Sequence, residues 1–196
     1  MTWQLLRFWI RLRRGRLPPW SLPDPIWYFA YGSNMNERLF RERRHMTPIE
    51  TRPARLDGYR LRFAVSGRRK SSVWAALVDF IHRFDQLAAG GRKPGLSAPV
   101  DIAHAPGERV WGALYLLPLR KFVRLDASEG RQYAYLWVDV EGRDGQTVRA
   151  LTYHVPYPAP EGYPSRGYLS LIREAARERG LPADYIAFLD QVEARQ

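Results

Sequence analysis

A glycine and two short polar residues directly follow an aromatic run, and this junction is well suited to bind an anion. The run Ile26-Trp27-Tyr28-Phe29-Ala30-Tyr31 precedes Gly32-Ser33-Asn34-Met35. Such a run predicts a buried strand, and Gly32 tolerates backbone angles that side chains forbid. Asn34 and Glu37 fit a capping box at a helix start. A strand that turns into a helix leaves backbone N–H groups unpaired, which suits a carboxylate, a phosphate or a developing oxyanion. A purely structural turn fits the same pattern.

Two carboxylates stand three residues apart in Leu125-Asp126-Ala127-Ser128-Glu129-Gly130. In a helical turn, Asp126 and Glu129 would share a face. The segment lies between an apolar helix and an aromatic strand. A carboxyl group beside aromatic walls loses hydration, and it can then take up and return a proton near neutral pH. The alternative is a pair of ordinary surface charges, because only the surroundings make a carboxylate catalytic.

Other common catalytic groups are missing or isolated. The chain has no cysteine, which excludes disulfides, thiolate metal ligands and a thiol nucleophile. The four histidines have no spacing typical of a metal site. Ser33 is not part of a G-x-S-x-G motif, and no histidine partner is suggested for it. The sequence therefore predicts no metal site and no covalent nucleophile.

The elements that must position these groups form one α+β domain. The 196 residues, 45% of them hydrophobic, can bury a sizeable core. We expect strands at 26–31, 54–65, 99–103, 110–117, 133–140 and 147–155, and helices at 35–44, 119–129, 168–179 and 183–194. Pro106-Gly107-Glu108 predicts a turn that makes a hairpin of 99–103 and 110–117. Residues 141–145 predict a second hairpin. Mixed hairpins and helices predict a sheet that curls into a small mixed β-barrel flanked by helices.

Two segments, 2–17 and 66–97, differ in character from the rest of the chain. Residues 2–17 interleave tryptophan and leucine with arginine, in a chain whose formal net charge is +11. This stretch is too short and too charged to span a bilayer. As a basic amphipathic helix it could lie on an anionic membrane surface, pack on a partner or pack on its own domain. We therefore divide the chain into a basic extension with a proline-rich linker (1–25) and a domain (26–196), in which 66–97 is a loop insertion or lid.

Five motifs occur in one order along the chain: YFAYGSNM, ARLDGYRLRF, PGERVWGALY, LDASEG and a closing GLP followed by Tyr185. Together they resemble the γ-glutamylcyclotransferase family, which includes the AIG2-like and butirosin-type cyclotransferases. The resemblance covers about residues 26–190 and implies the same small mixed barrel. Segment 66–97 is longer than expected for the family, and the basic extension is not one of its core features.

The resemblance implies a reaction and a set of site residues. Family members release 5-oxoproline from γ-glutamyl compounds by intramolecular cyclisation. The nucleophile is the substrate's own α-amine, so no cofactor is implied. By resemblance, Glu129 is the general acid and base, and loop N–H groups stabilise the oxyanion and hold the γ-glutamyl moiety. The substrate-binding residues so implied are Tyr31, Gly32, Ser33, Asn34, Met35 and Tyr168.

Other readings of the sequence remain open at this point. The first is a non-catalytic small-anion-binding or membrane-surface scaffold protein that uses the same pocket. The second is nucleic-acid binding, which the charge suggests but no recognised motif supports. We expect a small γ-glutamyl substrate as partner and no specific nucleic acid. We also expect a cytoplasmic location. Peripheral contact at the inner face of a membrane through residues 2–17 is one of the three alternatives given above for that segment.

Overall fold

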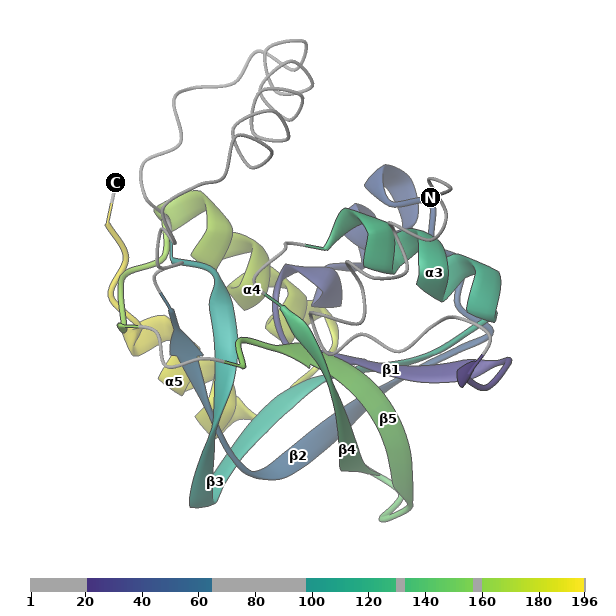
Figure 1. Cartoon of the computed structure of the whole chain (residues 1–196). Coiled ribbons are helices and arrows are strands. Elements are labelled where there is room, and N and C mark those ends of the chain that lie inside the picture. Colours follow the sequence, from purple (N-terminus) through teal and green to yellow (C-terminus); the bar gives the residue numbers. More distant parts are fainter. Residues whose placement is uncertain (1–20, 65–97, 130–132, 157–159, 196) are drawn as a thin grey trace, which may run out of the picture.

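A closed five-stranded barrel forms the centre of the molecule, and helices α3 and α4 lie across its upper side in the view of Figure 1. The computed structural model describes residues 21–64, 98–129, 133–156 and 160–195. The strands are β1 (Ile26–Ala30), β2 (Glu50–Phe63), β3 (Val100–Leu117), β4 (Ala134–Gly142) and β5 (Thr147–His154). Their order is β1-β3-β2-β4-β5. All neighbours are antiparallel except β1 and β5, which close the barrel in parallel at Tyr28 and Leu151. The predicted small mixed barrel is confirmed.

β2 and β3 are longer than the sequence pattern predicts. The expected hairpin between 99–103 and 110–117 is wrong, because β3 runs through Pro106-Gly107-Glu108 as one strand. Residues 105–108 of β3 face Gly58 alone, since the register of the β2–β3 pair shifts there. This irregularity absorbs the turn-forming residues without ending the strand, as β-bulges do. The second predicted hairpin, β4 with β5, is confirmed.

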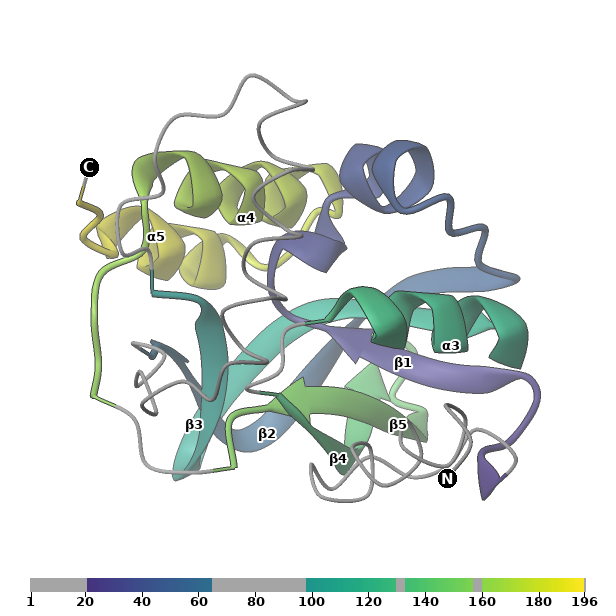
Figure 2. The same ribbon diagram turned by 45° about the horizontal axis from the view of Figure 1, so that its top comes forward.

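The helices are η2 (Ser33–Met35, a 3₁₀ turn), η3 (Leu39–Arg43, a π-helix), α3 (Leu119–Ser128), α4 (Arg166–Glu178) and α5 (Ala183–Gln191). The single helix expected at 35–44 is therefore wrong, since two short elements replace it. α3 lies along β1, and α4 lies beside η2 (Figure 2). Gly180, with φ +59°, follows the end of α4 in the left-handed region, as expected of a glycine C-cap.

The capping box predicted at Asn34 is also wrong. Met35 N–H donates to the Gly32 carbonyl at 2.9 Å, which closes a tight 3₁₀ turn. The next helical turn therefore starts later, and Asn36 caps it, its Oδ1 accepting from Leu39 N–H at 2.9 Å. The side chain of Asn34 is thereby released to face the interior.

Aromatic side chains fill the space between the barrel and the helices. Phe40 and Tyr115 stack with their ring centroids 4.4 Å apart, and Phe122 of α3 is fully buried. Asp24 Oδ1 accepts the N–H of Leu119 at 2.9 Å, which caps the start of α3. These contacts fix the start of α3 and its buried middle part in place.

Two predictions fall outside the described residues: the amphipathic segment 2–17 and the segment 66–97. Within the part of the chain that is described, no helix is long and apolar enough to cross a membrane.

Candidate active site

A small cavity of about 50 Å³ lies where the end of β1, the η2 turn and the end of α3 meet. Its walls are mostly phenol rings and loop backbone. The lining residues are Tyr28, Tyr31, Gly32, Ser33, Asn34, Arg44, Val100, Glu129, Tyr133, Tyr153 and Tyr168. Six of the seven residues expected at the site from the sequence are therefore brought together here, and Met35 is the exception.

Glu129 reaches the cavity from the last position of α3. It is the C-cap of that helix, with φ −76° and ψ 144°, so its side chain leaves the helical direction. Oε1 accepts from Asn34 Nδ2 at 2.9 Å and from Arg44 Nη1 at 3.2 Å, and the side chain is only 11% exposed. Oε2 accepts no hydrogen bond from the described residues. One oxygen is thus tethered, and the other has no partner among the described residues.

Asp126, the other carboxylate of this motif, does not line the cavity. The prediction that Asp126 and Glu129 lie on one helical face is wrong, because α3 ends between them at Ser128. Asp126 is buried in the core, where Oδ1 accepts from the Tyr153 hydroxyl at 3.1 Å. Three residues of separation place the two carboxylates in different surroundings, and Glu129 alone lines the cavity.

The side chain of Asn34 joins the loop to the carboxylate. Its Nδ2 donates to Glu129 Oε1 and to the Tyr28 hydroxyl, both at 2.9 Å. Its Oδ1 is buried and has no hydrogen-bond partner among the described residues. Buried acceptors are rarely left unpaired. A ligand that donates hydrogen bonds would satisfy this oxygen beside Glu129.

The backbone of the η2 turn offers donors to the same cavity. Met35 N–H and Asn36 N–H are used within the turn, on the carbonyls of Gly32 and Ser33. Among the described residues, the N–H groups of Gly32, Ser33 and Asn34 have no acceptor. Three adjacent free donors at a helix start can bind an oxyanion. Met35 instead places its side chain in the core, fully buried.

Gly32 lets the loop and the opposite wall approach closely. A Cβ built on it would lie 2.5 Å from Val100 Cγ1 and 3.4 Å from the Tyr168 hydroxyl. That hydroxyl in turn accepts from Val100 N–H at 3.4 Å. Glycine is required here by space, since its φ of −117° is ordinary.

The phenols around the cavity keep their protons. Burial raises the pKa of Tyr168 to about 12, with Glu129 adding to the effect. Burial likewise raises the pKa of Tyr28, Tyr31, Tyr133 and Tyr153 above the usual value for tyrosine. At neutral pH these side chains are therefore uncharged hydroxyls, which leaves Glu129 and Arg44 as the charged groups of the lining.

The loop is also held from behind. Arg179, at the end of α4, donates from Nε to the Met35 carbonyl and from Nη2 to the Tyr115 hydroxyl, both at 2.6 Å. Tyr115 in turn donates to the Asn34 carbonyl at 2.9 Å. The carbonyls of the turn are thereby tied to β3 and α4, and the N–H groups are turned the other way.

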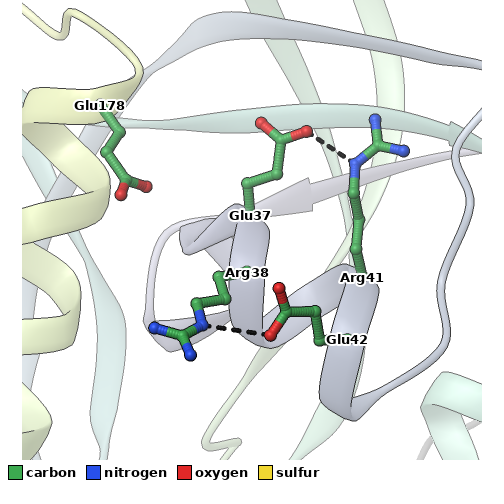
Figure 3. A pocket seen from close by; sticks show the side chains of 5 residues that line it. All are labelled: Glu37, Arg38, Arg41, Glu42 and Glu178. Atoms are coloured by element: carbon green, nitrogen blue, oxygen red, sulfur yellow. Dashed lines mark hydrogen bonds and ion pairs between the residues drawn. The ribbon is translucent and has the colours of Figure 1, made fainter.

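A larger hollow of about 520 Å³ lies elsewhere, among Glu37, Arg38, Arg41, Glu42 and Glu178. Figure 3 shows its side chains, among which Arg38 pairs with Glu42 at 3.1 Å and Arg41 with Glu37 at 2.6 Å. These pairs are exposed and satisfy one another. The hollow has no buried reactive group, so size alone does not identify the site.

Comparison with known proteins shows which proteins the chain resembles. The profile of the AIG2-like family matches residues 109–189, which include Glu129 and Tyr168. The γ-glutamyl cyclotransferase aclK of Aspergillus oryzae is 30% identical over 175 residues, which cover 83% of this chain and 59% of that protein. The γ-glutamylcyclotransferase of Homo sapiens is 28% identical over 174 residues, covering 85% of this chain and 78% of that protein. The chain is thus similar in sequence to the AIG2-like γ-glutamylcyclotransferases.

The fold agrees with this family. A solved γ-glutamyl cyclotransferase structure superposes with a TM-score of 0.68 at 23% identity, covering 88% of this chain and 90% of that one. This likeness concerns the fold alone. The chain spans 59% of the length of aclK and 66% of the length of gliK, the γ-glutamyl cyclotransferase of Aspergillus fumigatus.

Sequence reasoning missed several lining residues. Tyr28 and Tyr153 lie on neighbouring strands of the closed barrel, and only the β1–β5 pairing brings them together. The position of Tyr133 in the sequence could have identified it, since it closely follows Glu129. No sequence feature distinguishes Arg44, because it is one of 31 lysines and arginines in the chain.

Proposed function

We propose that this protein is a γ-glutamylcyclotransferase that releases 5-oxoproline from γ-glutamyl amines, amino acids or peptides. The observation that carries the proposal is the state of Glu129: Oε1 is tethered, and Oε2 has no partner among the described residues. The free N–H groups of the η2 turn line the same cavity. The names of the relatives point to the same reaction.

Glu129 serves as the proton carrier in this proposal. Oε2 takes a proton from the substrate's α-ammonium, and the freed amine attacks the γ-carbonyl carbon of the same molecule. A C–N bond forms to close the lactam, and the C–N bond to the leaving amine breaks. Of the three ammonium protons, one stays on the lactam nitrogen. Two are passed, one at a time, to the departing nitrogen, which leaves as an ammonium ion. Such proton transfer typically contributes about 10²- to 10⁴-fold in rate.

The η2 turn stabilises the charge that develops on the γ-carbonyl oxygen. Attack by the amine turns this oxygen into an oxyanion, and fixed N–H donors at such a position commonly contribute about 3 to 4 kcal/mol. The N–H groups of Gly32, Ser33 and Asn34 supply these donors. The carbonyls of Asn34 and Met35 are held from behind by Tyr115 and Arg179, so the loop need not rearrange during the reaction.

The test is 5-oxoproline release from a panel of γ-glutamyl amines, amino acids and peptides by wild type and Glu129→Gln. We expect wild type to release 5-oxoproline and the variant to be about 10²- to 10⁴-fold slower in kcat. Glu178→Gln, an exposed glutamate outside the cavity, is the matched control. Circular dichroism and thermal unfolding check that each variant is folded.

Turnover by Glu129→Gln at the wild-type rate would remove the carboxylate from its role. Absence of release from every substrate by folded wild type would instead favour the scaffold alternative, in which the cavity binds a small anion without chemistry. Contact of residues 2–17 with a membrane stays a prediction.

A further inference from the structure

Arg44 lies at the edge of the cavity and has no role in the scheme above. Its Nη1 donates to Glu129 Oε1 at 3.2 Å and to Ser128 Oγ at 2.6 Å. The side chain is 24% exposed, so it can still be reached from solvent. The proton transfers of the proposed reaction make no use of this cation. Its presence there calls for a further reason.

The backbone around Arg44 is fixed. Arg44 N–H donates to the Leu39 carbonyl at 3.1 Å at the end of η3, and Met46 N–H reaches back to the Phe40 carbonyl at 3.1 Å. Between them, His45 adopts φ +52°, the left-handed turn of a Schellman-like helix end. Lys121 of α3 donates to the His45 carbonyl at 2.9 Å. These contacts within η3 and from α3 hold the backbone of Arg44 at the cavity.

Part of the guanidinium is unused. Arginine carries five N–H donors, and the two hydrogen bonds of Arg44 both come from Nη1. Among the described residues, Nε and Nη2 have no acceptor. Arg179, by contrast, uses both Nε and Nη2 on the protein. A guanidinium with a free edge at a cavity fits a carboxylate, which it can bind through two parallel hydrogen bonds.

The cavity thus carries one cation and one anion side by side. An α-amino acid group has the opposite pair, an ammonium and a carboxylate on one carbon. Glu129 Oε2 and Asn34 Oδ1 are acceptors for the ammonium. The free edge of Arg44 is the donor for the carboxylate.

We propose that Arg44 binds the α-carboxylate of the γ-glutamyl group and makes that carboxylate a requirement for binding. This inference rests on the proposed function. With the α-carboxylate on Arg44, the free N–H groups of the η2 turn remain for the γ-carbonyl oxygen.

The experiment compares two substrates and four proteins. The substrates are the best γ-glutamyl compound of the panel and the same compound with its α-carboxylate converted to a carboxamide. The proteins are wild type, Arg44→Gln, Arg44→Lys and the control Arg41→Gln, which removes an exposed arginine paired with Glu37. The dissociation constants of 5-oxoproline and of 5-oxoprolinamide are measured on the same proteins.

We expect wild type and Arg41→Gln to prefer the carboxylate substrate by about 10- to 100-fold in kcat/KM, mainly through KM, as a charged hydrogen bond implies. Arg44→Gln should lose this preference and Arg44→Lys keep part of it. 5-Oxoproline should bind more weakly to Arg44→Gln by a similar factor, while 5-oxoprolinamide binds all four alike.

Equal losses on both substrates in Arg44→Gln would overturn this inference and leave the cyclotransferase proposal standing. Arg44 would then act through Glu129 alone. If wild type binds 5-oxoproline through Arg44 but releases none from any substrate, the inference holds and the activity fails. If wild type neither binds nor releases 5-oxoproline, both proposals fail.

Discussion

The turn after β1 and the end of α3 supply the same cavity with different kinds of groups, and the protein fixes them differently. The turn contributes backbone N–H groups, and Tyr115 and Arg179 hold its carbonyls from the far side. The end of α3 contributes one side chain, Glu129, which is held by a single oxygen. In the reaction proposed above, the turn would stabilise charge and so must stay still, whereas Glu129 would carry protons and so needs one free oxygen.

Gly32→Ala should break the turn most severely. The added Cβ would lie 2.5 Å from Val100 Cγ1, so the loop or β3 must move. A displacement of about 1 Å at a reacting centre can cost about 100-fold in rate, and we expect a loss of that size in 5-oxoproline release. The measurement is kcat/KM together with thermal unfolding. Wild-type kcat/KM in a folded variant would show that the loop backbone takes no part in the reaction.

Arg179→Gln should loosen the same turn from behind without touching the cavity. The variant loses a charged donor to the Met35 carbonyl, while Tyr115 still holds the Asn34 carbonyl. We expect kcat to fall about tenfold with little change in KM, the effect of one charged hydrogen bond on positioning. Arg177→Gln, which removes a surface pair with Asp190, is the control. A pure KM effect, or equal losses in both variants, would argue against positioning.

The smallest expected effect is that of Tyr168→Phe on the pH dependence of stability. It tests whether the phenol at the cavity stays neutral. Burial raises its pKa from 10.0 to about 12. Between those values the unfolded chain loses the phenol proton and the folded protein keeps it. The stability present below pH 10.0 is therefore lost as the pH rises towards about 12. Tyr168→Phe should make the fall in unfolding free energy over this range shallower.

Urea unfolding at a series of pH values from 7 to 11 measures this slope. An identical slope in wild type and Tyr168→Phe would contradict the burial of an intact phenol. Turnover should meanwhile show no loss from phenol ionisation below pH 10.0, because the raised pKa keeps the hydroxyl protonated there.

The sequence predicted the elements better than their connections. The aromatic run before Gly32 led directly to β1, because an apolar run indicates burial, and the turn residues 141–145 led to the hairpin of β4 and β5. The pattern failed at Pro106-Gly107-Glu108 and at Asn34, where local turn chemistry competes with long-range pairing. At Pro106-Gly107-Glu108, pairing with β2 keeps β3 a single strand. At Asn34, the 3₁₀ turn delays the next helical turn, so Asn36 caps it in place of Asn34.

The sequence alone indicated the resemblance to the γ-glutamylcyclotransferases, the barrel with its helices, and the candidate groups at Gly32–Asn34 and Glu129, because motif order and periodicity are local properties of the chain. Tertiary structure decided which carboxylate lines the cavity, since α3 ends between Asp126 and Glu129. It also decided that Arg44 lies beside Glu129, 85 residues away in sequence. No periodicity links residues so far apart, because their distance depends on how η3 and α3 pack around the end of β1.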